Sequence, residues 1–518
     1  IGTSIAISTL YLCPAQGLIF CGKKELSHYF QSDKKGEFFK MSIASNFRLL
    51  KTETLSKIHE ASLDILANTG VVFQSKECLD IFKNHGAKVD GQIVFIPEEM
   101  VDKAVKSSPD CFKWEALNCD RSINVGTKQE GIHVSMNNGP IYIQDLDKGR
   151  RPGTMEDLIN LYKLGQQSKM CSIVGQIPVE PSDVKNPHRY LDIFKQLLHH
   201  TDKPLFGYVG TQKEINQMFD MVKIYMGDSD CLTNKHLIGV SLNPLSPLQY
   251  DKTPCETMLA YAKHGQPIMA LTCAMSGVTA PIDPMGTVVL QNVEILAGLV
   301  LSQLINEGTP FIYSPASAIP NMRTASYITG SPVSNHINIA GIQLATELYG
   351  LPTRCMAGLT DSKTIDCQAG FETMQNYLML AMSGVNVVNE CFGILDAIMT
   401  VSYEKFIIDE EIMSRSAFVV KGIDSFEDDF SKNIIKEVGH GGSYLMHPST
   451  LKYCRSFWEP LVSENKSFDE WEKNGSLDIK QKANKMFKQI LENSPDMIID
   501  KAVSMDLEKY VKRVKKYS

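Results

Sequence analysis

Seven short apolar runs recur along the chain, each bounded by Gly or Pro and each followed by a longer segment of helical character. Their successive starts are 31 to 43 residues apart, the length of one strand and one helix. Strands that are apolar almost throughout are buried on both faces, as in a parallel sheet covered by helices. Seven such units predict a (β/α)8 TIM barrel. The runs begin near Ser172, Pro204, His236, Pro267, Pro310, Pro352 and Val385.

The eighth strand has two candidates, Ile132 to Met136 before the repeats and Gly442 to Met446 after them, and the sequence does not choose between them. An open doubly wound sheet is the runner-up fold. That fold would be expected to begin with a Gly-rich phosphate turn, and neither G-x-G-x-x-G nor G-x-x-x-x-G-K-[ST] occurs in the chain. The barrel is therefore the favoured architecture.

The flanking segments predict additions to the barrel. Helices are expected over Leu55 to Gly70, over Lys76 to His85 and from Pro97, with a strand over Gln92 to Ile96. These elements form an N-terminal α+β module, residues 41–130, ahead of a barrel at 131–455. A C-terminal extension, 456–518, is charged and helical and is expected to wrap the barrel or to form a dimer contact.

The first 22 residues carry no charge, which resembles a signal or membrane segment. The run has no basic start, however, and Pro14 interrupts it. Residues 34–41 can instead be back-translated to AAGGAG, a bacterial ribosome-binding sequence, at ordinary spacing before an ATG at Met41. We therefore expect residues 1–40 to be translated leader, the protein to begin at Met41, and no membrane role.

Charge and cysteine usage exclude further classes. The chain of 518 residues has 52 Lys and Arg against 59 Asp and Glu, so a basic surface for nucleic acid is not expected. None of the 13 Cys forms a C-x-x-C pair, which favours a reducing, cytoplasmic setting. No His has an i, i+4 His partner on a helix, so no metal site is expected. No nucleophile elbow or nucleotide signature is present either.

The active site of a barrel lies at the carboxyl ends of its strands. The residues at those predicted ends combine aromatic rings, amides, hydroxyls and acids, a combination that suits a small molecule such as a quaternary ammonium ion. Each residue could equally serve only to satisfy loop backbone. The strand-end set is Gln176, Glu180, Tyr208, Asn243, Thr272, Ser276, Tyr313, Ser314, Asp361, Asp366, Gln368, Asn389, Glu390 and Phe392.

Several segments are jointly recognisable by their order and spacing. They are Arg150 to Thr154 with Asp157, Leu351 to Lys363, Asp366 to Glu372, Ser383 to Asn386, Gly441-Gly442 with His447, and Trp458 with Pro460 and Trp471. From about Ile58 to Lys501 the chain resembles the trimethylamine methyltransferase family, in particular the members that lack pyrrolysine and act on quaternary amines such as glycine betaine.

The resemblance implies a TIM barrel that moves a methyl group from a methylated amine to the Co(I) centre of a separate corrinoid protein. This chain contains only the twenty standard residues, which disfavours trimethylamine and favours a betaine-like substrate. Corrinoid carriers supply an axial His from D-x-H-x-x-G, and the nearest match, Asn234 to Gly239, has Asn in place of Asp. No permanently bound cofactor is therefore expected, and the corrinoid should arrive on its cognate protein.

The site expectation follows from strand-end position. Tyr208, Tyr313 and Phe392 are expected to cage the cation, and Gln176, His336, Gln368 and Asp366 to complete substrate binding. Asp361, Glu390 and Asn389 are the expected catalytic residues. The alternatives are a trimethylamine methyltransferase working without pyrrolysine and a non-catalytic betaine-binding barrel. A homo-oligomer is expected.

Overall fold

The computed structural model describes residues 47–127 and 131–517, so the predicted leader lies outside the described residues. Its centre is a parallel sheet of eight strands in the order β14-β13-β11-β10-β9-β6-β16-β15. The sheet closes because Tyr313 on β14 pairs with Thr353, which precedes β15. The strands are β6 (His133–Ser135), β9 (Cys171–Gly175), β10 (Leu205–Phe206), β11 (Ile238–Leu242), β13 (Ile268–Thr272), β14 (Phe311–Pro315), β15 (Arg354–Met356) and β16 (Val387–Asn389).

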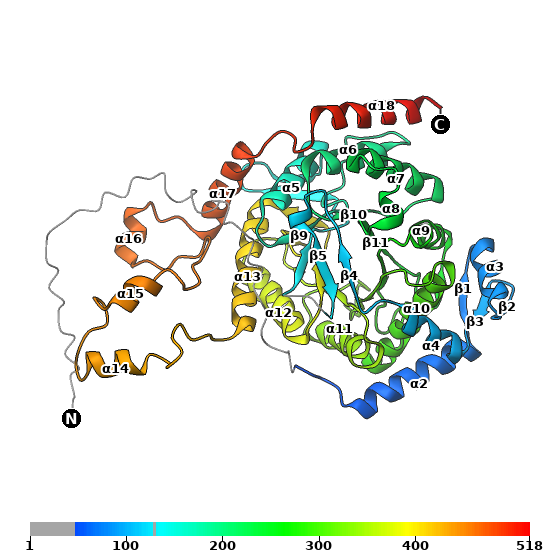
Figure 1. Cartoon of the computed structure of the whole chain (residues 1–518), viewed down its shortest axis with the longest axis horizontal. Helices are drawn as coiled ribbons and strands as arrows, with labels where there is room; N and C mark the ends of the chain where they lie inside the picture. The colour runs from blue at the N-terminus through cyan, green and yellow to red at the C-terminus, as the bar shows by residue number, and fades with distance from the viewer. Residues whose placement is uncertain (1–46, 128–130, 518) are drawn as a thin grey trace. The chain divides into compact units, whose positions relative to one another are not determined.

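A helix follows every barrel strand and packs on the outside, so the helices ring the sheet (Figure 1). The predicted TIM barrel and its seven runs are confirmed, and β6 at residues 133–135 is the eighth strand. The rival segment, residues 442–446, forms turns whose side chains are exposed. The helices are α5 (Met155–Gln167), α6 (Arg189–His200), α7 (Gln212–Met226), α9 (Lys252–Lys263), α10 (Pro284–Ile305), α11 (Pro332–Leu344), α12 (Cys367–Ser383) and α13 (Tyr403–Lys421).

The N-terminal segment contains the predicted helices and a small sheet. It comprises α2 (Thr52–Asn68), β1 (Val71–Phe73), α3 (Lys76–Asn84), β2 (Lys88–Asp90), β3 (Ile93–Phe95) and α4 (Glu98–Ser107). β12 (Gln249–Tyr250), from the loop after β11, adds to this sheet beside β1. Helices α2, α3 and α4 pack on α10 of the barrel wall. The segment is therefore continuous with the barrel.

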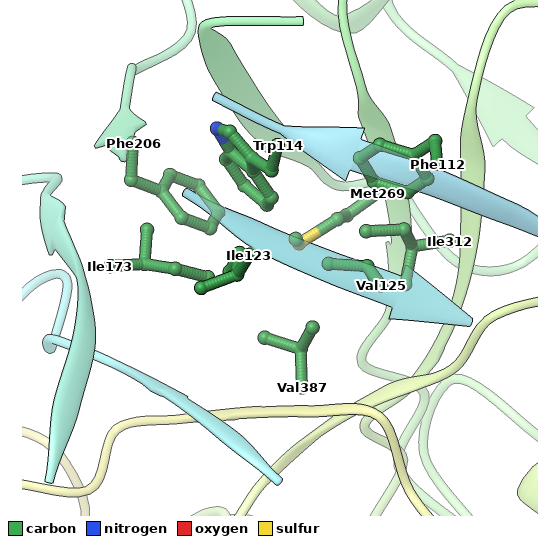
Figure 2. Close-up of a cluster of buried hydrophobic side chains, with 9 residues drawn as sticks. All are labelled: Phe112, Trp114, Ile123, Val125, Ile173, Phe206, Met269, Ile312 and Val387. Carbon is green, nitrogen blue, oxygen red and sulfur yellow. The ribbon is translucent and has the colours of Figure 1, made fainter. Parts of the chain in front are cut away.

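A hairpin closes the amino end of the barrel. The hairpin consists of β4 (Cys111–Trp114) and β5 (Ile123–Gly126). Its side chains Phe112, Trp114, Ile123 and Val125 pack among the inward-facing residues of the barrel strands (Figure 2). Trp114 donates its indole N–H to the Leu237 carbonyl at 3.3 Å. The neighbouring Gly239 is required, because a Cβ there would lie 2.3 Å from the Trp114 ring. The hairpin lies before residue 130, so the predicted boundary assigns it to the N-terminal module, although its side chains fill the floor of the barrel.

The chain after the barrel divides into two parts. α17 (Ile479–Asn493) packs on α13 and α5, and α18 (Lys501–Tyr517) packs on α6 and α7, so these two helices wrap the barrel. The last barrel helix ends at Lys421 rather than at the predicted residue 455. Between Lys421 and α17 lie the short helices α14 (Lys432–Val438), α15 (Pro448–Tyr453) and α16 (Phe468–Lys473), which contain no buried residue.

Two short strand pairs rise beyond the ends of β6 and β16. β7 (Tyr142–Asp145) and β8 (Gly149–Pro152) follow β6, while β17 (Ile394–Leu395) and β18 (Thr400–Ser402) follow β16. They join in one four-stranded sheet, in which β18 pairs with β7 in parallel. The sheet therefore links two neighbouring strand ends at the mouth of the barrel.

Within the described residues, α10 alone is long and apolar enough to cross a membrane. Its side chains are largely buried against strands β13 and β14 and against helices of the barrel and the N-terminal segment. This burial identifies α10 as a core helix of the barrel wall.

Candidate functional site

The barrel interior above the hairpin floor contains polar side chains that face one another. Side chains of laterally paired residues on parallel strands share a face. Ser135 pairs with Ile173, Ser241 with Met269, and Arg354 with Val387, and each of these partners belongs to the inward-facing floor cluster. Asn389 lies two residues beyond Val387 and faces inward as well. The sequence therefore places a set of polar side chains, here called the polar layer, on the inward face beside the apolar floor residues.

These groups lack hydrogen-bond partners among the described residues. Buried without a partner are Oγ of Ser135 and Ser241, Oδ1 of Asn389, Oε1 of Gln176, and both Nε and Nη1 of Arg354. Most buried polar atoms in folded proteins are hydrogen-bonded, and each exception costs about 1–3 kcal/mol. A group of such exceptions in one interior is typical of a site whose partner is a ligand or water.

Arg354 is the most informative member of the layer. Its side chain is 1% exposed, although Arg is almost never fully buried unless paired. Burial lowers the pKa of the guanidinium, and the negative charge of Glu390 opposes that shift. Arg354 and Glu390 nevertheless form no direct ion pair in the described part of the chain, so the two charges interact only at longer range.

Glu390 is held where β6 and β16 end side by side. The Asn138 backbone N–H donates to its Oε1 and Oε2 at 3.1 and 3.0 Å, and Asn389 Nδ2 donates to Oε1 at 3.2 Å. The backbone of Glu390 is left-handed, with φ of 54°, a strained conformation often found at functional sites. Burial raises the pKa of this carboxyl to about 7, while the Asn138 N–H and Arg354 act to lower it.

The side chain of Asn137, in the loop after β6, fixes the end of β16, where Glu390 lies. Asn137 Oδ1 accepts the Phe392 N–H at 3.0 Å, and Asn137 Nδ2 donates to the Phe392 carbonyl. Both bonds join the loop after β6 to the loop after β16. The position of the Glu390 carboxylate therefore depends on two strands that are distant in sequence.

An apolar layer covers the polar one on the side of the mouth. Tyr327 packs on it from the loop between β14 and α11, and donates its hydroxyl hydrogen to the Ala316 carbonyl. Burial raises the pKa of the Tyr327 hydroxyl well above its ordinary value. The layer consists of Leu271, Ala316, Met356, Leu359 and Ile394, with Cys273, Tyr327 and Ile398 packed against it.

The three predicted cage aromatics do not meet. Tyr313 faces the helix layer, where its hydroxyl donates to Asn292 Oδ1 on α10 at 3.0 Å. Phe392 stacks on Phe406 of α13, with ring centroids 4.5 Å apart. Tyr208 donates its hydroxyl hydrogen to the Tyr190 carbonyl. The rings therefore point to three different places, and the structure does not assemble them into one cage.

Most of the predicted polar residues have structural partners outside the polar layer. Asp361 accepts the N–H groups of Thr329 and Gly330 at 3.0 and 2.9 Å and so anchors the loop that carries Tyr327. Asp366 caps the N-terminus of α12 by accepting the Ala369 N–H at 2.9 Å. Gln368 donates to Glu372 Oε1 at 3.0 Å.

The remaining predicted residues divide between the interior and the surface. His336 is exposed on α11. Glu390 and Asn389 come together at the end of β16, and Gln176, just after β9, is buried with an unpartnered Oε1. These three are the predicted residues whose positions suit a ligand in the barrel.

Tyr208 lines a separate cavity of about 140 Å³ between α6 and α7. Glu180 and Arg189 form an ion pair on its wall, and Tyr190 and Glu214 complete its polar lining. The cavity is lined by the loops that follow β9 and β10 and by α6 and α7. Within residues 47–127 and 131–517, no three His, Cys, Asp or Glu side chains cluster closely enough to hold a metal ion.

The strand-end argument missed Arg354 and Tyr327. Arg354 lies inside an otherwise buried strand, and an arginine in such a run is unusual enough to be a signal in itself. Tyr327 lies in a loop 12 residues after the end of β14, and no sequence pattern indicates that its ring returns to the barrel axis.

Comparison with solved structures supports the fold. Monomethylamine methyltransferase (MtmB) from Methanosarcina barkeri superposes with a TM-score of 0.52 over 92% of each chain, at 13% identity. At this identity the likeness concerns the fold.

Sequence comparison supplies the family. A glycine betaine methyltransferase of Desulfitobacterium hafniense (strain Y51) is 34% identical over 466 residues, which cover 90% of this chain and 96% of that protein. A proline betaine:corrinoid methyltransferase of Eubacterium limosum is 30% identical over 421 residues, covering 79% and 86% respectively. A trimethylamine methyltransferase MttB of D. hafniense (strain DSM 10664 / DCB-2) is 28% identical over 457 residues, covering 87% and 90%.

The model of the family described as trimethylamine methyltransferase (MTTB) matches residues 30–518, nearly the whole chain. This match agrees with the barrel, with the relatives and with the segments recognised in the sequence. The chain belongs to the trimethylamine methyltransferase family.

Proposed function

We propose that this enzyme moves a methyl group from a quaternary amine that carries a carboxylate, a betaine, to the Co(I) corrinoid of a separate protein. The names of two relatives, a glycine betaine methyltransferase and a proline betaine:corrinoid methyltransferase, support this function. The structural observation that carries it is Arg354, a buried cation with two unpartnered nitrogen atoms in the barrel interior. Trimethylamine has no group that could pair with it.

The polar layer is complementary to a zwitterion. The Arg354 guanidinium would donate hydrogen bonds to the betaine carboxylate, for which its planar fork is well suited. The Glu390 carboxylate, fixed by Asn138 and separated from Arg354, would face the quaternary nitrogen. The Tyr327 ring would add an aromatic face for the cation. Ser135, Ser241 and Asn389 would satisfy the remaining polar contacts.

The chemistry demands little acid–base work from the protein. The Co(I) corrinoid supplies the nucleophile that takes the methyl carbon. The electron pair of the broken N–C bond remains on nitrogen, so a neutral tertiary amine leaves without a proton. The barrel residues would orient the substrate and exclude water, because the hairpin closes the floor and the apolar layer lines the side of the mouth.

The methyl acceptor would approach from the mouth, because Trp114 and its neighbours close the opposite end. We propose that the enzyme works in the cytoplasm as a homo-oligomer, with the corrinoid carried by its cognate protein. Support for a reducing compartment comes from the cysteines of the described residues, which are free thiols.

An amine panel tests this function. The purified enzyme is incubated without oxygen with Co(I) corrinoid protein and with glycine betaine, proline betaine, carnitine or trimethylamine, and methyl-Co(III) is followed by absorbance. Methylation with a betaine is expected. Methylation with trimethylamine alone would contradict the proposal, and tight betaine binding without methyl transfer would identify a non-catalytic barrel.

A further inference from the structure

The segment Gly422–Pro460 leaves the barrel wall and returns to it at the same helix. We name this segment the arm. It begins where α13 ends at Lys421 and returns at Leu461, Val462 and Ser463, whose backbone N–H groups donate to Glu411 Oε2 at 2.9, 2.6 and 2.9 Å. These bonds lower the pKa of the Glu411 carboxyl and outweigh the effect of its burial. Both ends of the arm are therefore attached to α13.

A second contact fixes the returning end. The Arg415 guanidinium lies over the Trp458 ring, 4.4 Å from its centroid, and pairs with Glu411 at 2.9 Å. Trp458 also donates its indole N–H to Ser414 Oγ at 3.0 Å. The arm thus projects from a defined base.

Within the arm, one aromatic group joins the two halves. The Phe426 and Tyr453 rings stack with centroids 4.7 Å apart, and Phe457 packs on Phe426 at 6.0 Å. Tyr453 donates its hydroxyl hydrogen to the Phe426 carbonyl at 3.1 Å. These ring contacts cover part of the apolar surface of the arm, and its other large apolar side chains remain exposed.

The outward side of the arm is strongly apolar. Seven large side chains are between 57% and 98% exposed, and no residue of α14 or α15 is buried. Figure 1 shows α14 and α15 lying outside the ring of barrel helices. Isolated exposed apolar residues are common, whereas a concentration in one segment marks an interaction surface. The seven are Ile423, Phe430, Ile435, Leu445, Met446, Leu451 and Phe457.

The exposed area matches what a stable dimer needs. Seven side chains at roughly 100–200 Å² each amount to about 1,000 Å² on one chain. A stable interface of standard size buries about 800 Å² from each partner, and interfaces between permanent partners are the more apolar ones. The arm alone therefore supplies enough surface for one side of a permanent contact.

The position of the arm favours a second copy over the methyl acceptor. Barrel helices run from the carboxyl ends of the strands back to the amino ends. The arm leaves α13 at its C-terminus, on the side of the floor, whereas a methyl acceptor has to reach the mouth. A protein that binds and leaves in each turnover also requires a surface that is stable in water, and this surface is not.

The charges of the arm are self-complementary. Its acidic run, Glu427 to Asp429, and its basic residues Lys436 and Arg455 lie on the same segment, while Lys452 is already 3.8 Å from Glu427 within one chain. In a two-fold contact, each surface meets the same surface of its partner, so the acidic part of one arm can face the basic part of the other. We propose that the arm is the centre of a homodimer interface, in which two arms pack on each other around a two-fold axis.

Assembly of the full-length protein tests this proposal independently of its activity. The mass is measured by sedimentation at about 0.1–10 µM, where a permanent dimer stays associated and a weakened one dissociates on dilution. Leu445→Glu with Leu451→Glu is the test variant, since both side chains are exposed in one chain and their replacement leaves its core intact. The dimer dissociation constant is expected to rise about 100-fold or more.

The matched control is Leu245→Glu with Ile282→Glu, two exposed apolar residues on loops outside the arm. It is expected to remain dimeric. Hydrogen exchange gives a second measurement, in which amides of residues 430–453 should exchange more slowly in the dimer than in the test variant. A monomeric wild-type protein, a test variant that dimerises normally, or equal weakening by the control would each overturn the proposal.

Discussion

Replacing Arg354 by Met should stabilise the empty enzyme and weaken betaine binding. The side chain is 1% exposed, and two of its nitrogen atoms lack partners among the described residues, so the folded protein bears an uncompensated desolvation cost. At about 1–3 kcal/mol for each unsatisfied group, an apolar replacement should raise the free energy of unfolding by about 1–3 kcal/mol after loss of packing is subtracted. For a chain of this length, the midpoint of thermal unfolding should rise by about 1–3 °C.

The effect on binding has the opposite sign. A buried guanidinium that pairs with a carboxylate contributes about 3–5 kcal/mol when the partner would otherwise be unpaired, so the dissociation constant of the betaine should rise by about 150- to 5,000-fold. Calorimetry measures the binding and scanning calorimetry the stability. Arg121→Met is the control, because Arg121 lies at the surface with Asp202.

A purely structural role for Arg354 predicts a different pair of changes in stability and affinity. A group kept for packing would, on removal, lower stability and leave affinity unchanged. If Arg354→Met unfolds at a lower temperature than wild type and still binds betaine normally, then the guanidinium has a structural role, and the zwitterion site in the barrel is refuted.

Three further predictions concern the carboxyl at the mouth, the floor and the loop of Tyr327. The pKa of Glu390 is raised to about 7, so the anion that attracts the cation forms only as the pH rises through 7. Betaine affinity should therefore fall about tenfold per pH unit below 7 in calorimetry, and Glu390→Gln should remove that dependence. Trp114→Ala should lower the free energy of unfolding by about 3–5 kcal/mol in denaturant titrations, because it empties the buried floor; an unchanged midpoint would contradict this packing. Asp361→Ala should release the bonds to Thr329 and Gly330 and speed tryptic cleavage after the exposed Arg323; an unchanged cleavage rate would show that Asp361 does not anchor the loop.

The strand-and-helix repeat predicted the barrel because a strand that is buried on both faces consists almost entirely of apolar residues, and such runs are visible in the sequence. The seven apolar runs correspond to seven barrel strands, and the N-terminal helices lie within a few residues of their predicted bounds. The choice of the eighth strand required tertiary contacts. β6 is only three residues long, and its pairing with β16 joins segments about 250 residues apart in the chain.

The three rings predicted to form a cage point to different places in the structure. Position at a strand end does not specify a face, because one residue of register turns a side chain from the interior to the helix layer. Tyr313 lies on the outer face of β14. Gln176 and Glu390 both adopt positive φ, with values of 55° and 54°, which interrupts the alternation at the ends of their strands.

The sequence by itself determined the barrel, the family and the presence of a charged, aromatic strand-end set, because periodicity and motif order are local properties of the chain. Only the tertiary structure decided which of those residues share an interior. It brings Arg354 from β15 to Glu390 at the end of β16, closes the floor with a distant hairpin and leaves the apolar arm uncovered. These results depend on the register of neighbouring strands and on contacts between remote segments, which no single stretch of sequence contains.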